Sequence, residues 1–475
     1  MKEPKHDQRA IGNLGVMSGK SRVRNNPLDL MLVSRDASNI EGEAGLFFAP
    51  SSPDEVVAAV RHCVERNIPF VARGAGTGLA GGAVPEDGAA VISLMQLNKV
   101  REVNATERWA WVEPGVLNAD LTKAVSRSGL IFAPDPSSQQ SCSIGGNVAN
   151  NSGGPHCLSE GATSAHVLAV EVVLSDGSMT ILDQESAPFD LRGGFVGSEG
   201  MFGIATAVKV RLLPAAPCVA TAVIGFPTVE AGALAVSAII AGGVVPAALE
   251  MMDAPITRAV EEYVHAGFPL DAGALLIIEV EGLANAVRTD IETCLAVCRS
   301  HGASTVRMAA SASERAVIWK GRKTAFGAIA RIAPNYYLHD TVVPRSKLAS
   351  VLADVGSIAA SEDLMVMNVF HAGDGNLHPL LLFDKRTPGI MDRVHRAGAE
   401  IVRVSIEAGG VLSGEHGIGL EKRDFMSLMF DEADLAAQRM LREAFEPTGL
   451  ANPGKVLPSP SGCGDPLAAP AGAWI

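Results

Sequence analysis

Three glycine-rich segments of the chain constrain its fold most strongly. They occupy residues 73–83, 134–154 and 197–204, all within about 130 residues of one another. Because glycine has no Cβ, such loops can present successive backbone N–H groups to a pyrophosphate at close range. A single glycine loop is more often a turn than a binding site. Three in succession indicate a long dinucleotide that lies across one part of the chain.

The surroundings of the first glycine segment disfavour a nicotinamide nucleotide. A Rossmann loop opens a helix and is followed by an acidic residue about 20 positions later. Here the loop follows an expected strand at 70–72 and continues through Pro85 towards another strand. We therefore disfavour a Rossmann fold and nicotinamide binding.

The order of helical and strand patterns predicts an α+β fold. We expect an N-terminal arm or capping helix over 1–40, an α+β domain over 41–215, a second α+β domain over 216–457 and a disordered tail over 458–475. A helix begins at Ser52-Pro53, with valines following on one face. The other expected elements are strands 70–72, 90–94, 109–112, 168–174, 205–212, 220–226 and 274–280, helices 229–241 and 286–301, a hairpin over 366–383 and helices within 391–445.

Charge and hydropathy exclude two classes of function. The formal net charge is −13 and no stretch clusters lysine and arginine, which excludes a nucleic-acid role. The most apolar stretch, 231–245, ends at Pro246 and is shorter than the roughly 18 residues that a membrane helix needs. Since no secretory signal stands near the N-terminus, we expect the protein in the cytoplasm.

The seven cysteines favour a reducing compartment and argue against an iron–sulfur cluster in this chain. Their number is odd and their spacing wide, Cys294 and Cys298 are the only close pair, and no CxxC run occurs. If the chain takes electrons from a substrate, they must therefore leave it by a route other than an iron–sulfur cluster of its own.

A histidine-rich loop and an acidic loop together predict a divalent metal site. His371 and His378 flank a glycine-rich turn, and pairing of the apolar runs on either side would bring both imidazoles to the mouth of that turn. Residues 409–419 place Glu415 and His416 side by side among glycines. Two histidines and one carboxylate form a metal set with open coordination positions, suited to zinc, manganese or iron(II).

The three glycine segments carry a family resemblance. The runs RGAGTGLAGGA, PDPSSQQSCSIGGNVANNSGG and GSEGMFGIATAVKVRLLP resemble the FAD domain of the vanillyl-alcohol oxidase and p-cresol methylhydroxylase superfamily. More narrowly, the chain from about residue 50 to 457 resembles the FAD-binding subunits of glycolate oxidases and their D-lactate dehydrogenase relatives. The resemblance implies a PCMH-type FAD-binding domain of two α+β subdomains, then an α+β substrate or cap domain whose C-terminal helical segment returns to the FAD domain.

The same resemblance implies non-covalent FAD, because Thr77 stands where covalent members carry the histidine that bonds the flavin. Residues 73–78 would wrap the pyrophosphate, and the closing motif 452–455 would bring the C-terminus back against the FAD domain. The implied FAD-binding residues are Arg73, Gly74, Ala75, Gly76, Thr77, Gly78, Pro134, Asp135, Ser138, Gly145, Gly146, Asn150, Gly153, Ile204 and Asn452.

The resemblance also implies a D-2-hydroxy acid as substrate. His371, His378 and Glu415 match the metal ligands of metal-dependent relatives, and His416 matches their catalytic base. An α-hydroxyl must lose its proton as hydride leaves for the flavin, which a metal ion and a neutral imidazole both assist. In the cationic run 319–323, Arg322 matches an arginine that relatives use for substrate, and arginine suits a carboxylate.

We therefore expect an enzyme subunit that oxidises glycolate. D-lactate stays open as a further substrate. Leu338 and Leu380 stand where hydroxyglutarate relatives carry polar groups, so the pocket suits a smaller acid. In the family, a second FAD-type subunit and an iron–sulfur subunit take the electrons towards membrane quinone. Two alternatives stay open, a self-sufficient D-lactate dehydrogenase and a non-catalytic FAD-binding scaffold subunit. A scaffold, however, has no need of the histidine-rich and acidic loops.

Overall fold

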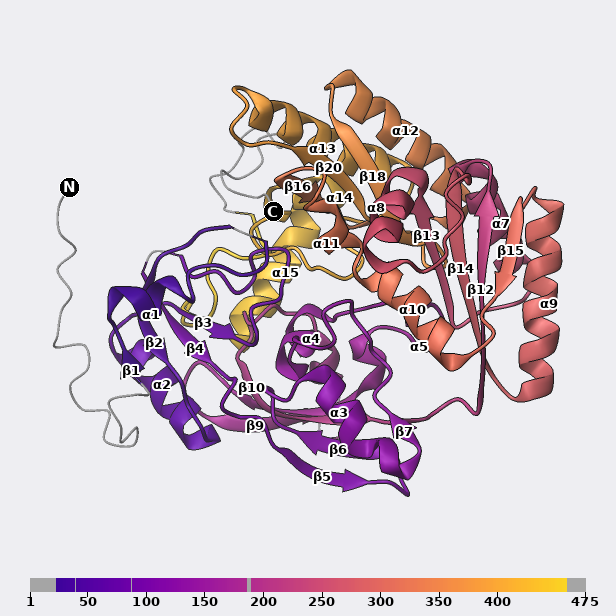
Figure 1. The fold of residues 1–475 in the computed structure, drawn as a ribbon. Helices are drawn as coiled ribbons and strands as arrows, with labels where there is room; N and C mark the ends of the chain where they lie inside the picture. The colour runs from indigo at the N-terminus through magenta and orange to yellow at the C-terminus, as the bar shows by residue number, and fades with distance from the viewer. Residues whose placement is uncertain (1–22, 39, 87, 186–188, 459–475) are drawn as a thin grey trace.

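The computed structural model describes residues 23–458 except 39, 87 and 186–188, and it has the expected α+β class. The rest of the expected arm, 1–22, and the expected tail from 459 onwards lie outside the described residues. The chain forms an N-terminal part, drawn in indigo to magenta in Figure 1, and a C-terminal part that begins after Pro214 and is drawn in pink to yellow.

A mostly parallel four-stranded sheet opens the N-terminal part. Its elements are β1 (Val23–Arg24), α1 (Pro27–Met31), β2 (Ala44–Phe48), α2 (Pro53–Glu65), β3 (Phe70–Arg73) and β4 (Ala89–Ser93). The strand order is β1-β2-β4-β3, so residues 23–24, inside the arm expected over 1–40, already pair with β2. Ser52 caps α2 by accepting the N–H of Glu55, which confirms the expected helix start. β3 leads directly into the first glycine segment.

An antiparallel five-stranded sheet of order β5-β6-β10-β8-β9 completes the N-terminal part. The helix α4 lies within the second glycine segment, and α6 ends just before the third. The elements are β5 (Val100–Asn104), β6 (Trp109–Val112), α3 (Asn118–Val125), β7 (Leu130–Ile131), α4 (Ile144–Asn150), α5 (Cys157–Glu160), β8 (Val167–Val173), β9 (Met179–Asp183), α6 (Leu191–Phe195), β10 (Ile204–Arg211) and β11 (Leu213–Pro214).

A nine-stranded antiparallel sheet forms the centre of the C-terminal part. Its strands are β12 (Cys218–Phe226), β13 (Ala248–Asp253), β14 (Ala274–Gly282), β15 (Thr305–Met308), β16 (Asn335–Leu338), β17 (Thr341–Val342), β18 (Met365–His371), β19 (Asn376–Leu377) and β20 (Pro379–Phe383). β18 pairs with both β19 and β20, which confirms the expected hairpin and puts His371 and His378 at its turn.

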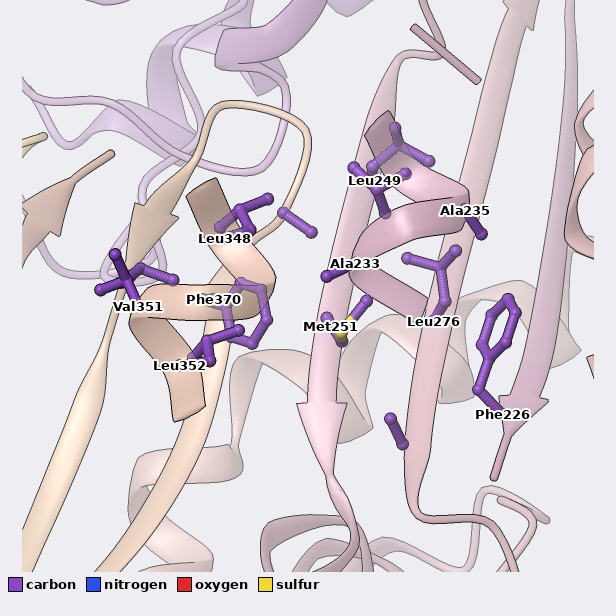
Figure 2. Packing of buried hydrophobic residues seen from close by; sticks show 14 of the residues in the cluster. Phe226, Ala233, Ala235, Leu249, Met251, Leu276, Leu348, Val351, Leu352 and Phe370 are labelled. Atoms are coloured by element: carbon purple, nitrogen blue, oxygen red, sulfur yellow. The ribbon is translucent and has the colours of Figure 1, made fainter. Parts of the chain in front are cut away.

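Helices cover both faces of this sheet. The helices of the C-terminal part are α7 (Val229–Ala241), α8 (Ala254–Val264), α9 (Ala284–Ser300), α10 (Ala312–Lys323), α11 (Ala325–Ile329), α12 (Leu348–Ser361), α13 (Ile390–Glu407), α14 (Met426–Met429) and α15 (Glu432–Phe445), of which the last two pack on α13 rather than on the sheet. Leu276 of β14 packs on the face of α7, α9 and α12, whereas the adjacent Leu275 packs on the face of α8, α10 and α11. Figure 2 shows the first face, with Leu348 of α12 beside Phe370 and Ala233 of α7 beside Met251. A sheet buried on both faces explains its continuous apolar strands.

The end of the described chain returns to the N-terminal part, as expected. Phe445 of α15 stacks on Phe202 with ring centroids 4.7 Å apart. The backbone of Phe70 donates to Leu450 and accepts from Asn452, so the closing segment runs along β3. In Figure 1 the yellow α15 lies against the N-terminal part. The closing segment therefore packs against the N-terminal part beside the first glycine segment.

The elements expected from the sequence all occur, with ends that shift by at most two residues. Several others were not expected, and β13 is the most informative. Its sequence, ALEMMD, is fully buried but contains Glu250 and Asp253. Strand patterns rarely contain buried carboxylates, because each needs a buried partner. Among the described residues, no helix is both long and apolar enough to cross a bilayer.

Candidate active site

A cavity of about 460 Å³ lies between the two parts of the chain. All three glycine segments contribute to its wall on the N-terminal side. The C-terminal part contributes Lys323, Phe326, Tyr336, Leu338, His378, Glu415 and His416. An elongated ligand lying along the glycine segments would therefore end at histidine and carboxylate side chains.

Most of the expected FAD-binding residues line this cavity. They are Arg73, Gly74, Ala75, Gly76, Thr77, Gly78, Ser138, Gly145, Gly146, Asn150 and Ile204. Four others, Pro134, Asp135, Gly153 and Asn452, do not line it. Asn452 donates to the carbonyl oxygens of Gly82 and Glu199, so it ties the closing segment to two cavity walls. Direct contact with FAD stays a prediction for all fifteen residues, whether or not they line the cavity.

The walls fit a dinucleotide because the loops approach each other too closely for side chains. A Cβ on Gly74 would lie 2.4 Å from the Ser143 hydroxyl, and one on Gly145 would lie 2.5 Å from the Cβ of Pro114. Gly76 has φ of +74°, a conformation that favours glycine. The cradle is therefore built from backbone, which leaves N–H groups accessible to phosphate oxygens.

His371, His378 and Glu415 come together as expected. Their candidate ligand atoms all lie within 4.8 Å of one another. Glu415 Oε1 is 3.1 Å from His371 Nε2 and 3.5 Å from His378 Nε2. Neither ring nitrogen of His378 has a hydrogen-bond partner among the described residues, although its side chain is only 2% exposed. A buried imidazole left without partners fits a metal ligand.

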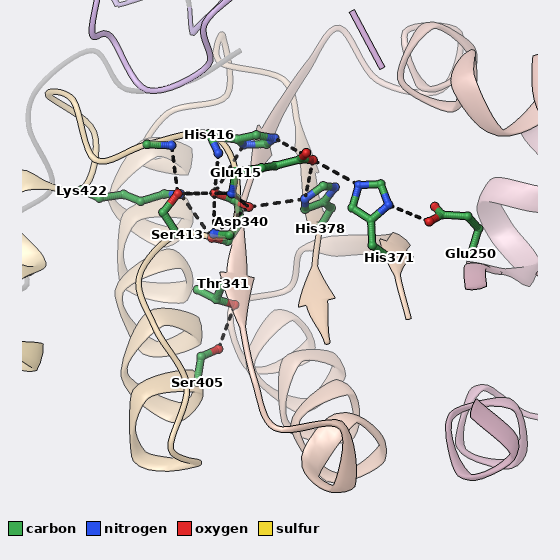
Figure 3. Close-up of polar contacts among 12 residues, drawn as sticks. Glu250, Asp340, Thr341, His371, His378, Ser405, Ser413, Glu415, His416 and Lys422 are labelled. Carbon is green, nitrogen blue, oxygen red and sulfur yellow. Dashed lines mark hydrogen bonds and ion pairs between the residues drawn. The ribbon is translucent and has the colours of Figure 1, made fainter. Parts of the chain in front are cut away.

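Glu250 contacts His371 on the ring nitrogen that does not face Glu415. His371 Nδ1 lies 2.7 Å from Glu250 Oε1, so Nε2 points to Glu415 (Figure 3). A carboxylate on the second ring nitrogen is the usual support of a metal-binding histidine. Burial alone would lower the pKa of His371, but the carboxylates of Glu250 and Glu415 outweigh it and raise the pKa to about 10. A metal ion would therefore have to displace a proton from this ring.

A second group of candidate ligands, Asp340, His378 and His416, shares His378 with the first. It is the poorer metal site, because both oxygens of Asp340 already accept hydrogen bonds from the 413–416 loop. Glu415 has an oxygen facing both histidines. The set of His371, His378 and Glu415 therefore fits a divalent ion better.

His416 lies next to this set on the cavity wall. Its ring centroid is 5.0 Å from that of His378, and its Nε2 is 3.9 Å from Glu415 Oε1. Burial lowers the pKa of His416 to about 4, although Asp340 and Glu415 oppose the shift. The imidazole is therefore neutral near pH 7 and free to accept a proton.

Arg322, expected to bind the substrate carboxylate, lies away from the cavity wall. Its side chain is 1% exposed, and Nη2 lies 2.6 Å from Glu250 Oε2. The neighbouring Lys323 lines the cavity, where its ammonium is 3.3 Å from Asp135. The structure thus places Arg322 beside Glu250, the residue that contacts His371, and Lys323 in the wall of the cavity. Arg322 as the substrate-binding group stays a prediction.

Several residues of the site were not expected from the sequence. Glu250 and Asp340 are fully buried, and Glu199 lies in the third glycine segment without an expected role. The sequence does contain a signal for Glu250 and Asp340, because a carboxylate inside an apolar strand or directly after one must find a buried partner. The pattern does not identify that partner, which lies more than 70 residues away in each case.

The fold and the site together define an FAD-linked oxidoreductase. Residues 44–183 match the model of an FAD binding domain, and residues 216–456 match that of the C-terminal domain of FAD linked oxidases. The chain belongs to this family of FAD-linked oxidases. The expected family and fold are thereby confirmed, and FAD is its cofactor.

The comparison with individual proteins narrows the relationship. The chain is 43% identical to the glycolate oxidase subunit GlcD of Escherichia coli over 88% of its own length and 85% of that protein. It is 31% identical to a D-lactate dehydrogenase of Anaerostipes hadrus over 86% of its length and 88% of the relative. The structure of p-cresol methylhydroxylase with substrate bound shares the fold, with a TM-score of 0.75, 14% identity and coverage of 92% of this chain and 94% of that one.

Gly145→Ala is expected to weaken FAD binding. The new Cβ would lie 2.5 Å from Pro114, so the start of α4, which lines the cavity, would have to shift. Overpacking of about 1–3 kcal/mol corresponds to a dissociation constant raised about 5-fold to 150-fold. Gly327→Ala is the control, because its Cβ would have nothing within 4 Å. Fluorescence titration of the deflavinated proteins with FAD measures the effect, and equal affinities would contradict the assigned cradle.

Proposed function

We propose that this protein oxidises a small 2-hydroxy acid, glycolate or D-lactate, to the 2-oxo acid by hydride transfer to non-covalent FAD. The observation that carries the proposal is one cavity whose wall combines the glycine segments with His378, Glu415 and His416. A flavin cradle without substrate chemistry would need none of these three side chains. The names of the relatives, a glycolate oxidase subunit and a D-lactate dehydrogenase, support the same substrate class.

We assign the reaction to the chain's residues as follows. His371, His378 and Glu415 would hold a divalent ion against the substrate hydroxyl. When bound, the ion lowers the pKa of that hydroxyl and the flavin supplies the acceptor for the hydride from Cα. The neutral imidazole of His416, which lies on the cavity wall, accepts the hydroxyl proton. Glu250 keeps His371 turned towards Glu415.

We also propose that the cavity favours small acids. Lys323 is the cation that the C-terminal part places in the wall alongside the apolar side chains of Phe326 and Leu338. We propose that the ammonium of Lys323 meets the substrate carboxylate, while Arg322 balances the buried charge of Glu250. An apolar wall would leave a second carboxylate without a partner, which disfavours dicarboxylic hydroxy acids.

The electrons leave to another protein in this proposal. No CxxC run occurs in the sequence, so an iron–sulfur cluster would have to come from a partner. We propose a second FAD-type subunit and an iron–sulfur subunit, which would also bring a cytoplasmic chain to the membrane. The word subunit in the name of the Escherichia coli relative supports this arrangement. A self-sufficient D-lactate dehydrogenase is the second candidate, and co-purification of an iron–sulfur protein would decide against it.

Glycolate or D-lactate is expected to bleach the flavin absorbance of the purified protein under anaerobic conditions. A strong chelator should abolish the bleaching, and added Mn²⁺ or Zn²⁺ should restore it, because the ligand set would then be filled again. The faster acid identifies the preferred substrate. A flavin that neither acid reduces would contradict the proposed activity, and bleaching that survives chelation would contradict the metal alone.

His416→Gln is expected to slow reduction of the flavin by at least about 100-fold, because the amide cannot accept the proton. Flavin and metal contents should stay at wild-type levels, since His416 is not in the preferred ligand set. Stopped-flow absorbance under anaerobic conditions measures the rate. Unchanged reduction would remove His416 as the base and leave the cofactor assignment intact.

Lys323→Gln is expected to raise KM for the substrate about 10-fold or more, as loss of a charge-assisted hydrogen bond of about 1.5–3 kcal/mol implies. Lys320→Gln is the matched control, because Lys320 lies on the same helix and is exposed. Steady-state kinetics with an artificial acceptor measure both. An unchanged KM in Lys323→Gln would return the carboxylate to Arg322.

A further inference from the structure

The loop at 413–416 carries two residues of the proposed chemistry, Glu415 and His416, yet it has no regular secondary structure. It contains Gly414 and is followed by Gly417 and Gly419, both with positive φ. Glycine-rich backbone of this kind is conformationally free unless other groups fix it. Whatever holds this loop therefore decides where the metal ligand and the base stand.

Asp340 is the group that the loop surrounds. Its carboxylate accepts three consecutive backbone N–H groups, those of Gly414 at 3.1 Å, Glu415 at 3.2 Å and His416 at 3.0 Å. The hydroxyl of Ser413 donates to it at 2.6 Å, and the Lys422 ammonium donates at 3.0 Å. Figure 3 shows Asp340 at the centre of these contacts. The loop is wound around one carboxylate.

The position of Asp340 in the fold makes it a fixed point. It stands directly before β17, which pairs with β19 next to His378. Val342 and Val411 exchange backbone hydrogen bonds, so the approach to the loop is fastened to the same strand. Asp340 Oδ1 lies 3.5 Å from His378 Nε2, and Oδ2 lies 4.0 Å from His416 Nδ1. One rigid strand therefore positions a carboxylate that touches both loops of the site.

Only donors surround the Asp340 carboxylate on the side of the 413–416 loop. The Lys422 ammonium, 3.0 Å away, gives the carboxylate a positive partner. An anion at the centre of converging N–H groups is stabilised by each of them. Replacing it by a neutral amide would turn one oxygen into a donor facing other donors.

We propose that Asp340 is a positioning residue that sets Glu415 as a metal ligand and His416 as the base by anchoring the 413–416 loop. The inference rests on the proposed function and deepens it. Asp340 acts through the backbone of the two residues and neither binds the ion nor takes the substrate proton. Its saturated oxygens are the reason that it stands outside the ligand set.

A second carboxylate holds the residues that directly follow this loop. Glu199 of the N-terminal part accepts the N–H groups of Ile418 at 2.7 Å and Gly419 at 2.9 Å. Asn150, which lines the flavin cavity, donates to the carbonyl of His416 at 3.1 Å. The loop is thus held by Asp340 at the ligand-bearing end and by Glu199 beyond it. In this arrangement Asp340 sets the geometry of the metal ligands. Glu199 sets the distance between the loop and the wall of the flavin cavity.

The test compares Mn²⁺ binding by the FAD-loaded wild-type protein and Asp340→Asn, both stripped with chelator. Electron paramagnetic resonance of free Mn²⁺ gives the dissociation constant independently of the flavin colour. We expect Asp340→Asn to bind Mn²⁺ about 10–100-fold more weakly, the usual effect of removing the support of a ligand. FAD content should be unchanged, and the rate of flavin reduction at saturating Mn²⁺ should stay depressed because His416 is displaced as well.

Two further variants keep the test decisive. Asp253→Asn is the control, since Asp253 is also buried and accepts backbone N–H groups, from Ile256 and Asn368, without touching the 413–416 loop. Ser413→Ala removes a single contact to Asp340 and should weaken Mn²⁺ binding about 3–10-fold even if Asp340→Asn does not fold. Wild-type Mn²⁺ affinity in a folded Asp340→Asn protein overturns the inference. If Asp340→Asn does not fold, wild-type Mn²⁺ affinity in Ser413→Ala overturns it. No Mn²⁺ binding by the wild type would instead overturn the proposed metal and this inference with it.

Discussion

Buried charge organises the interior of this protein, because an ionised group leaves water at tolerable cost only where partners neutralise it. Glu250 meets this need through Arg322 and His371, and Asp340 meets it through Lys422 and the N–H groups of a glycine-rich loop. The same contacts fix imidazole and carboxylate side chains at the wall of the cavity. The geometry of the site therefore depends on a small set of buried ion pairs.

The division of labour between the two parts of the chain follows from their backbones. The N-terminal part offers glycine loops, whose exposed backbone suits phosphates but carries few reactive side chains. The C-terminal part offers a hairpin that carries two histidines and a glycine-rich loop that carries a carboxylate, and their ligand atoms lie within 4.8 Å of one another. The closing segment at Asn452 joins both beside the first glycine loop. Neither part alone would form the cavity.

The sequence predicted the fold well because its strongest signals are local. Glycine loops, apolar strands and a capped helix start occur where expected, and the hairpin brings His371 and His378 together. Long-range charge pairing has no local signal. Glu250 lies in the strand β13, which the sequence did not predict because two carboxylates interrupt its apolar pattern. The cationic run around Arg322 likewise did not indicate that Arg322 pairs with Glu250. The domain limits and the contacts of FAD with individual residues stay predictions.

The most direct test of this account is a crystal structure of the FAD-loaded protein soaked in Mn²⁺, with anomalous scattering to locate the ion. The account predicts one strong peak at about 2.0–2.3 Å from His371, His378 and Glu415, with the flavin ring at the His416 end of the cavity. A peak on Asp340, His378 and His416, or a flavin ring at the opposite end, would contradict it.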